Sequence, residues 1–298
     1  MDNVLTLMTD PATRSLDEGD VRTAAQAIIG AGGKAGDADW LAKSIACDLP
    51  LGGITPKQAT EAVRARLKGR PVDFVAQETT GRRKQLLVAD MESTIIENEM
   101  LDELAAACGI GEAIADITAR AMAGELDFEG AIRARVGMLQ GLGTEALESS
   151  LKAIRMTPGA KALIATMRAH GAYCALVSGG FQFYTEWVRQ RLGFDYDQSN
   201  RLEIANGTLT GNVHEPILGR DAKREALLRL ADEQDIAIEA ALTVGDGAND
   251  LAMLEAAGMG VAYHAKPVVA ESARARIDHG DLTALLYLQG YRQSDFRD

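Results

Sequence analysis

The sequence is poor in cysteine and in aromatic residues. Its three cysteines, Cys47, Cys108 and Cys174, are far apart, and no two of them form a CxxC pair. This spacing argues against a zinc site or a disulfide framework, and it fits the reducing cytoplasm, where we expect the protein to work. Aromatic side chains make up only 5% of the chain, against 47% for all hydrophobic residues. We therefore expect a core built mainly from aliphatic side chains.

Positive charge and long apolar runs are also scarce. The formal net charge is −12, which argues against nucleic acid as a partner, because backbone phosphates are bound by basic surfaces. A small anionic substrate is compatible with this charge, since a local pocket can be basic in an acidic protein. No apolar stretch approaches the roughly 20 residues of a membrane-spanning helix, and no signal peptide is evident. We expect no membrane association.

The length of 298 residues favours two domains. Residues 1–80 predict a small α+β domain with the order β-α-β-α-β, and one further strand is left open. Its second helix has a start signal, in which Thr55 and Gln58 form a capping box around Pro56. The polar and basic segment 79–84 is interpreted as a linker.

The second domain is predicted over residues 85–298, where continuous apolar runs alternate with helical patterns. Such runs predict a doubly wound parallel sheet that is covered on both faces, with ligand sites at the carboxyl ends of the strands. Residues 98–156 look helical throughout, and we interpret them as a cap inserted between the first two core strands. Asn206 and Gly207, between two short alternating runs, predict a β-hairpin.

Two carboxylates follow the first core strand, Asp90 at its end and Glu92 two positions later. One carboxylate can attack an electrophile, and the other can move a proton to the leaving group and then take one from water. Acids after strands are also common turn and helix-cap residues, so this pair alone decides nothing.

Three further elements suit a phosphate and a cation. Ser178, followed by Gly179, can offer a hydroxyl and backbone N–H groups to phosphate oxygens, and Lys223 can neutralise phosphate. The oxygen-bearing side chains that follow the third apolar strand suit Mg²⁺; these are Asp246, Asn249 and Asp250. Each element also has an ordinary structural interpretation as a turn, a surface residue or a helix cap.

The order of the four elements, with a helical insertion after the first, resembles the haloacid dehalogenase superfamily of phosphotransferases over about residues 85–290. Within it, three segments resemble the phosphoserine phosphatase family. They are ADMESTIIENEMLDEL from position 89, FEGAIRARV from position 128 and VGDGANDLAML from position 244. The resemblance implies a haloacid dehalogenase-like fold and hydrolysis of L-phosphoserine to serine and phosphate, a step of serine biosynthesis.

The resemblance also implies a role for each motif residue. Asp90 forms an aspartyl-phosphate, Glu92 is the acid and base, and the ligands of Mg²⁺ are Asp90, Asp246 and the backbone carbonyl of Glu92. The phosphate is held by Ser178, Gly179 and Lys223, with Asn249 and Asp250 supporting the metal and phosphate shell. In the cap, Glu99 faces the substrate ammonium, Arg135 its carboxylate, and Phe128 helps to close the pocket.

One position departs from the family, which usually has aspartate where this chain has Glu92. Glutamate keeps the carboxylate but extends its reach by a methylene group. Three alternatives therefore stay open: phosphoserine as the substrate, another small phosphomonoester such as phosphohomoserine or a sugar phosphate, and an impaired enzyme that binds amino acids as a regulator. The N-terminal domain resembles ACT-like modules in topology only, which implies amino-acid binding or a homodimer.

Overall fold

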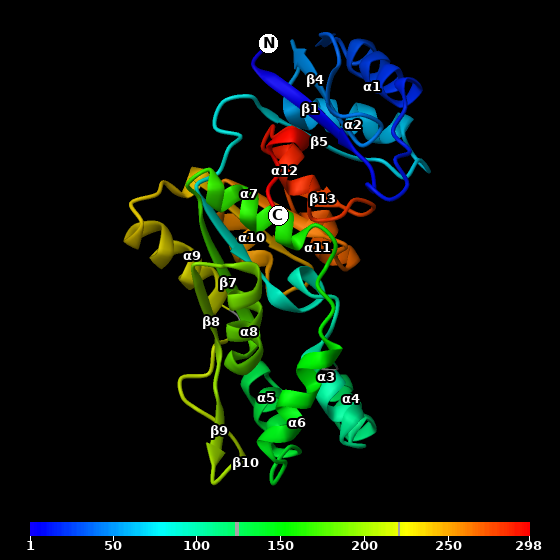
Figure 1. Cartoon of the computed structure of the whole chain (residues 1–298). Helices are drawn as coiled ribbons and strands as arrows, with labels where there is room; N and C mark the ends of the chain where they lie inside the picture. The colour runs from blue at the N-terminus through cyan, green and yellow to red at the C-terminus, as the bar shows by residue number, and fades with distance from the viewer. Residues whose placement is uncertain (123–124, 220) are drawn as a thin grey trace.

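The computed structural model describes residues 1–122, 125–219 and 221–298. Two sheets organise the chain, and Figure 1 shows the first, smaller unit at the end of the molecule opposite the cap helices. No helix of the described ranges is both long and apolar enough to cross a membrane.

The first unit is an antiparallel sheet with two helices packed on it. Its strands are arranged in the order β2-β4-β1-β5, with β3 paired to β4. The elements are β1 (Asn3–Met8), α1 (Glu18–Gly30), β2 (Lys34–Ala35), β3 (Asp39–Ala42), β4 (Ala46–Gly52), α2 (Pro56–Arg66) and β5 (Asp73–Glu78). The predicted order is extended by β2 and β3, which are too short to show a period of two in the sequence.

Local capping explains where the two helices begin. The capping box predicted at α2 is present, because Thr55 accepts from the Gln58 N–H while the Gln58 side chain accepts from the Thr55 N–H. A second capping box joins Asp17 and Asp20 at the start of α1. These side chains satisfy N–H groups that the first helical turn leaves without partners.

The second unit is built on a parallel sheet with the strand order β13-β12-β11-β6-β7-β8. Its strands are β6 (Leu86–Ala89), β7 (Tyr173–Phe181), β8 (Tyr196–Asn200), β11 (Ala241–Gly245), β12 (Met259–Tyr263) and β13 (Ala275–Ile277). Alternate residues of β6 belong to different cores: Leu87 lies in one apolar cluster and Val88 in another. This arrangement confirms the predicted doubly wound sheet with both faces covered.

Helices cover both faces of this sheet. The cluster on the Leu87 face includes residues of α7 (Ala160–Ala169), α8 (Gln182–Leu192) and α12 (Ala284–Leu288). The cluster on the Val88 face includes residues of α9 (Ala222–Glu233), α10 (Leu251–Ala256) and α11 (Pro267–Ser272). The sequence did not reveal β8, whose residues are mostly polar, or the three-residue β13.

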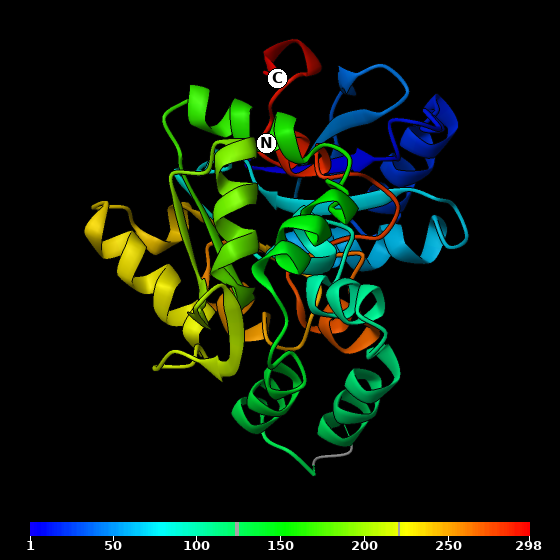
Figure 2. The same cartoon turned by 60° about the horizontal axis from the view of Figure 1, so that its bottom comes forward.

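The cap lies between β6 and β7 in the chain. It consists of α3 (Met100–Ala107), α4 (Gly111–Met122), α5 (Phe128–Gly137), α6 (Thr144–Ser150) and a short 3₁₀ turn (Leu151–Ala153). A bridge between Ile96 and Met156 joins the two chain segments at its base. Figure 2 shows the cap helices grouped on one side of the molecule.

The predicted hairpin forms from β9 (Leu202–Ala205) and β10 (Thr208–Val213), with Asn206 and Gly207 at positive φ, as its two-residue turn requires. The hairpin packs on the cap: the Gly141 N–H donates to the Leu209 carbonyl at 2.8 Å, and β10 lies against α5. The hairpin thus supports the cap from outside.

Arg82, which lies in the segment predicted as a linker, contacts both units. Its guanidinium donates to both carboxylate oxygens of Asp48, at 2.7 and 3.1 Å, and to the Thr6 hydroxyl at 3.0 Å. It also donates to the Leu288 carbonyl of α12 at 3.2 Å. Arg82 is therefore a largely buried contact between the two units, within the segment that was predicted as a linker.

Asp73 makes a second contact between the units. Its carboxylate accepts hydrogen bonds from the backbone N–H groups of Asp278, His279 and Gly280, at 2.7 to 3.0 Å. Because these three donors belong to the loop after β13, the first unit is fixed to the edge of the second sheet.

Candidate active site

Two adjacent strands bring the first catalytic candidates together. In β6 and β11, Ala89 lies opposite Val244, so both strands end at the same edge of the sheet. Asp90 follows β6, and its N–H donates to the Val244 carbonyl at 3.0 Å. Asp246 follows β11. The carboxyl ends of parallel strands are where such sheets place their sites.

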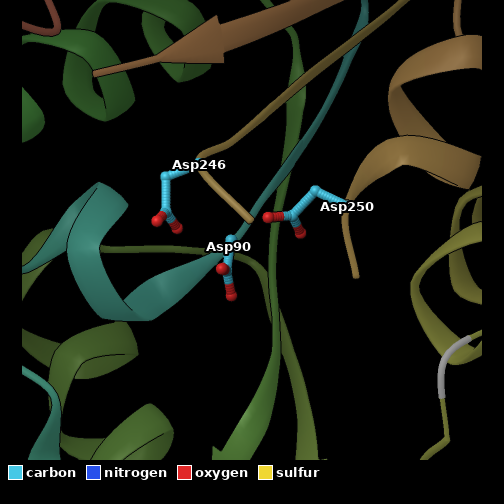
Figure 3. A group of neighbouring side chains, drawn as sticks. All are labelled: Asp90, Asp246 and Asp250. Carbon is cyan, nitrogen blue, oxygen red and sulfur yellow. The ribbon is translucent and has the colours of Figure 1, made fainter. Parts of the chain in front are cut away.

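Three carboxylates meet at this edge. Each of Asp90, Asp246 and Asp250 offers an oxygen within 4.8 Å of the others, and Figure 3 shows their side chains turned toward a common space. Gly245 leaves the room for this cluster, because a Cβ atom there would collide with the Asp250 carboxylate.

Lys223 is the buried cation of the cluster. Its ammonium lies 2.7 Å from Asp90 Oδ1 and 2.5 Å from Asp250 Oδ1. The other oxygen of Asp250 accepts from the Gly247 N–H at 2.9 Å. Both Asp250 oxygens therefore already have partners, while Asp246 has none of these contacts.

The charges of the cluster do not balance, since it contains three carboxylates and the ammonium of Lys223, which is paired with two of them. Burial, followed by the neighbouring Asp250, raises the pKa of Asp90 well above its ordinary value. The same causes raise the pKa of Asp246 to about 6. Burial by itself would lower the pKa of Lys223, but Asp90 and Asp250 raise it above its ordinary value. An all-oxygen donor set with excess negative charge can hold a hard divalent cation.

A small cavity adjoins the cluster, and it is lined by side chains from four parts of the chain. Its walls include the predicted phosphate-site residues Ser178, Gly179, Lys223 and Asn249, together with Phe128 of the cap. Ser178 is buried, and its hydroxyl accepts from the Gly180 N–H at 2.9 Å. Five residues predicted from separate motifs thus share one cavity.

A second cavity of about 280 Å³ lies between the sheet edge and the cap. Glu99, the residue that precedes α3, and Arg135 of α5 both line it. Ser93 donates to Glu99 at 2.8 Å, and the Arg135 Nε donates to the Ala131 carbonyl at 3.3 Å. Gly179 lines both cavities, so the two cavities lie next to each other.

Glu92 also lines the second cavity, and its longer side chain has a specific support. One carboxylate oxygen accepts from the Met100 N–H, in the first turn of α3, at 2.8 Å. Its other oxygen would lie 2.9 Å from a Cβ atom at Gly180, so the glycine leaves room for it. Burial, followed by Glu99, raises the pKa of Glu92 to about 7. A carboxyl with this pKa can both give and accept a proton near neutral pH.

The structure brings all the residues predicted for the site to one edge of the sheet and the cap above it. Sequence reasoning missed Asp102 and Lys266, which also line the second cavity. Lys266 could have been found, because it lies just after the apolar run that forms β12. Asp102 is one of several acids near the start of α3, and no local signal separates it from its neighbours.

Comparison with known proteins places the chain in a defined group. A model of the haloacid dehalogenase-like hydrolases matches residues 87–255. A phosphoserine phosphatase of Streptomyces coelicolor is 40% identical over 252 residues, which are 84% of this chain and 62% of the relative. A phosphoserine phosphatase of Vibrio cholerae is 44% identical over 192 residues, 64% of this chain and 58% of the relative. The chain thus spans about three fifths of the length of these two relatives.

The fold as a whole also has a solved counterpart. The crystal structure of a hydrolase of the same family from Salmonella enterica serovar Typhi superposes with a TM-score of 0.85 at 30% identity. The superposition covers 96% of this chain and 98% of that one. The counterpart therefore contains both units and the cap.

Proposed function

The chain belongs to the haloacid dehalogenase-like hydrolase family, and we propose that it is a magnesium-dependent phosphomonoesterase with L-phosphoserine as its substrate. The observation that carries this proposal is the pair of adjacent cavities, which share Gly179 in their walls. One is lined by Lys223 and Ser178 beside the carboxylate cluster, and the other presents Glu99 and Arg135. A substrate that fits both has a phosphate at one end and an amino-acid zwitterion at the other.

The donor set supports Mg²⁺ as the cofactor. Asp90 and Asp246, with the backbone carbonyl of Glu92, would hold the ion, since both oxygens of Asp250 are occupied by Lys223 and the Gly247 N–H. Bound Mg²⁺ offsets the negative charge that gathers around a phosphoryl group during transfer. Asp250 supports the site indirectly by holding Lys223.

The chemistry proceeds in two steps. Asp90 attacks phosphorus and forms an aspartyl-phosphate, while the carboxyl of Glu92 protonates the serine oxygen as the phosphorus–oxygen bond breaks. Glu92, now a carboxylate, then takes a proton from water as the water attacks the aspartyl-phosphate. Free phosphate and the original Asp90 result. Lys223 stabilises the phosphoryl charge in both steps.

Recognition of serine is assigned to the cap. Glu99 binds the substrate ammonium and Arg135 its carboxylate, while Phe128 closes the cavity on the phosphate side, whose wall it forms in part. The ring of Phe128 would lie 3.5 Å from a Cβ atom at Gly179, so the ring of the cap residue lies close to the loop that follows Ser178. We also propose that the protein works in a reducing compartment such as the cytoplasm, since Cys47, Cys108 and Cys174 are free thiols.

The test is phosphate release from L-phosphoserine with and without Mg²⁺, alongside phosphohomoserine, phosphoethanolamine and a sugar phosphate. We expect L-phosphoserine to have the highest kcat/KM and chelation of Mg²⁺ to stop turnover. A higher kcat/KM for the sugar phosphate would contradict the proposed substrate. Turnover that persists after chelation would contradict the proposed cofactor.

A further inference from the structure

Lys266 is the second cation on the wall of the cavity that presents Glu99 and Arg135. It follows β12 and directly precedes α11. Its N–H donates to the Asp246 carbonyl at 3.2 Å, and its own carbonyl accepts from the N–H groups of Val269 and Ala270 at 2.9 and 3.0 Å. The backbone of Lys266 is therefore tied to the Asp246 loop on one side and to α11 on the other.

The turn before Lys266 is fixed as well. His264 has a positive φ of 44°, its N–H donates to the Ile277 carbonyl at 2.8 Å, and its Nε2 lies 2.8 Å from the Gly280 carbonyl. The side chain of Lys266, by contrast, is exposed. Within the described ranges, no carboxylate lies within the 4.0 Å of an ion pair with its ammonium. A fixed backbone thus holds a flexible cation at the cavity.

The charges around the cavity indicate what the ammonium of Lys266 could bind. Besides Lys266, its charged walls are Glu92, Glu99, Asp102 and Arg135. A substrate carboxylate that entered with Arg135 as its only partner would meet one cation and the carboxylates of Glu99 and Asp102, with that of Glu92 added whenever it is ionised. Lys266 reduces that excess of negative charge, because Coulomb forces in a partly enclosed cavity are weakly screened.

The geometry points to Lys266 as a substrate-binding residue that holds the carboxylate of an amino-acid phosphate together with Arg135. This inference rests on the proposed function. The carboxylate is favoured over the phosphate because the cavity lined by Ser178 and Lys223 does not include Lys266. The phosphate end already has its own buried cation there.

Arg135 and Lys266 would bind the carboxylate of the substrate, and Glu99 would bind its ammonium. The two charges of the amino-acid end would therefore be recognised by separate groups. Arg135 reaches the cavity from the cap, whereas Lys266 reaches it from the end of a core strand. The substrate carboxylate would therefore be held by both parts of the second unit. A phosphomonoester that lacks this group would lose that link between core and cap.

The test compares Lys266→Met with the parent on two substrates that differ in one group, L-phosphoserine and phosphoethanolamine. Methionine keeps the length and apolar character of the side chain and removes only the charge. For L-phosphoserine, we expect KM to rise about tenfold with kcat changed less than about twofold, the scale of one charged hydrogen bond. For phosphoethanolamine, which has no carboxylate, KM should stay within about twofold.

Two control variants define the result. Lys161→Met removes an exposed lysine of α7 that does not line the cavity, and it should leave both substrates unaffected. Lys266→Arg keeps the charge, so its KM for L-phosphoserine should stay close to that of the parent. The Mg²⁺ concentration that gives half-maximal activity should not rise in Lys266→Met, since the ammonium of Lys266 acts on Asp246 through its charge and its removal can only favour a cation there.

The outcomes separate this inference from the proposed function. Equal losses on both substrates, or a loss that arginine does not restore, would overturn the assignment of Lys266 to the carboxylate. An unchanged KM for L-phosphoserine would do the same. If the parent itself released no phosphate from L-phosphoserine while it hydrolysed phosphoethanolamine, the proposed substrate would fail first, and the carboxylate site with it.

Discussion

Two buried groups of charged side chains differ in how completely their charges are paired. Arg82 and Asp48 form one pair, with Thr6 and the carbonyls of Tyr287 and Leu288 satisfying the remaining guanidinium donors. At the other site, the single ammonium of Lys223 lies among the carboxylates of Asp90, Asp246 and Asp250.

The difference separates a structural role from a chemical one. The Arg82 pair is electrically neutral and each guanidinium nitrogen has a hydrogen-bond acceptor, so the pair joins the two units without a further counter-charge. The Lys223 cluster has excess negative charge in a buried place, which is costly unless a cation binds. That cost shifts the pKa values of its carboxyl groups, as is common at functional sites. The predictions below probe this contrast, from the largest expected effect on turnover to the smallest.

Asp90→Asn should abolish turnover, because an amide is a poor nucleophile and a poor ligand for Mg²⁺. Phosphate release measures the loss, and trapping with beryllofluoride and Mg²⁺ should place the adduct of the parent on Asp90. Without Mg²⁺, the variant should unfold at the same temperature as the parent or higher, because one of three crowded carboxylates is gone. An adduct on another residue would refute the proposed nucleophile.

Glu92→Gln should lower turnover of L-phosphoserine by roughly a hundredfold or more, the scale of general acid–base catalysis. The amide keeps the size of the side chain but cannot transfer the proton. The loss should be smaller for p-nitrophenyl phosphate, whose leaving group hardly needs protonation, if aspartyl-phosphate formation limits the rate. Glu92→Asp should keep clear activity. If Glu92→Gln turned over L-phosphoserine like the parent, Glu92 would have no part in proton transfer.

The pH dependence follows from the raised pKa of Glu92, about 7. Leaving-group protonation needs the carboxyl form, which is present below this pKa and is lost as pH rises through it. For L-phosphoserine, kcat/KM should therefore fall above about pH 7, by about tenfold per pH unit at the limit. A profile measured from pH 5 to 9 tests this, and the descending limb should be absent in Glu92→Gln. A limb that persists in that variant would belong to another group.

Arg135→Ala should lower kcat/KM for L-phosphoserine by about tenfold to a hundredfold, since a charged contact with the substrate carboxylate is lost. For phosphoethanolamine the loss should stay below about threefold. Steady-state kinetics on both substrates measure this selectivity. Arg133→Ala, on the same helix but outside the cavity lining, is the matched control and should leave kcat/KM for both substrates unchanged.

Arg82→Met should leave kcat and KM unchanged and instead lower the free energy of unfolding. Removing one partner of a buried ion pair leaves Asp48 without its cation, which costs about 3–5 kcal/mol. Urea denaturation measures the loss, and the exposed Arg66→Met should change stability by no more than about 0.5 kcal/mol. A large loss of turnover in folded Arg82→Met would show that the contact between the units also serves the chemistry.

Local interactions made several elements predictable from the sequence alone. The start of α2 at Pro56 was predicted to the residue, because capping depends only on neighbouring residues. The Asn206-Gly207 turn was predictable for the same reason, since its backbone conformation depends on these two residues. Four motifs in a fixed order, each after an apolar strand or at a helix start, were enough to predict which residues would gather at the sheet edge.

Only the tertiary structure decided how those residues interact. The raised pKa of Glu92 depends on burial and on Glu99, and its support depends on the start of α3 and on the absence of a side chain at Gly180. Lys266 joins the cavity because β12 ends beside β11. Arg82 joins the two units because segments near residues 48 and 288 meet around it. These effects come from contacts between distant segments, which no local pattern records, whereas the elements themselves follow from neighbours along the chain.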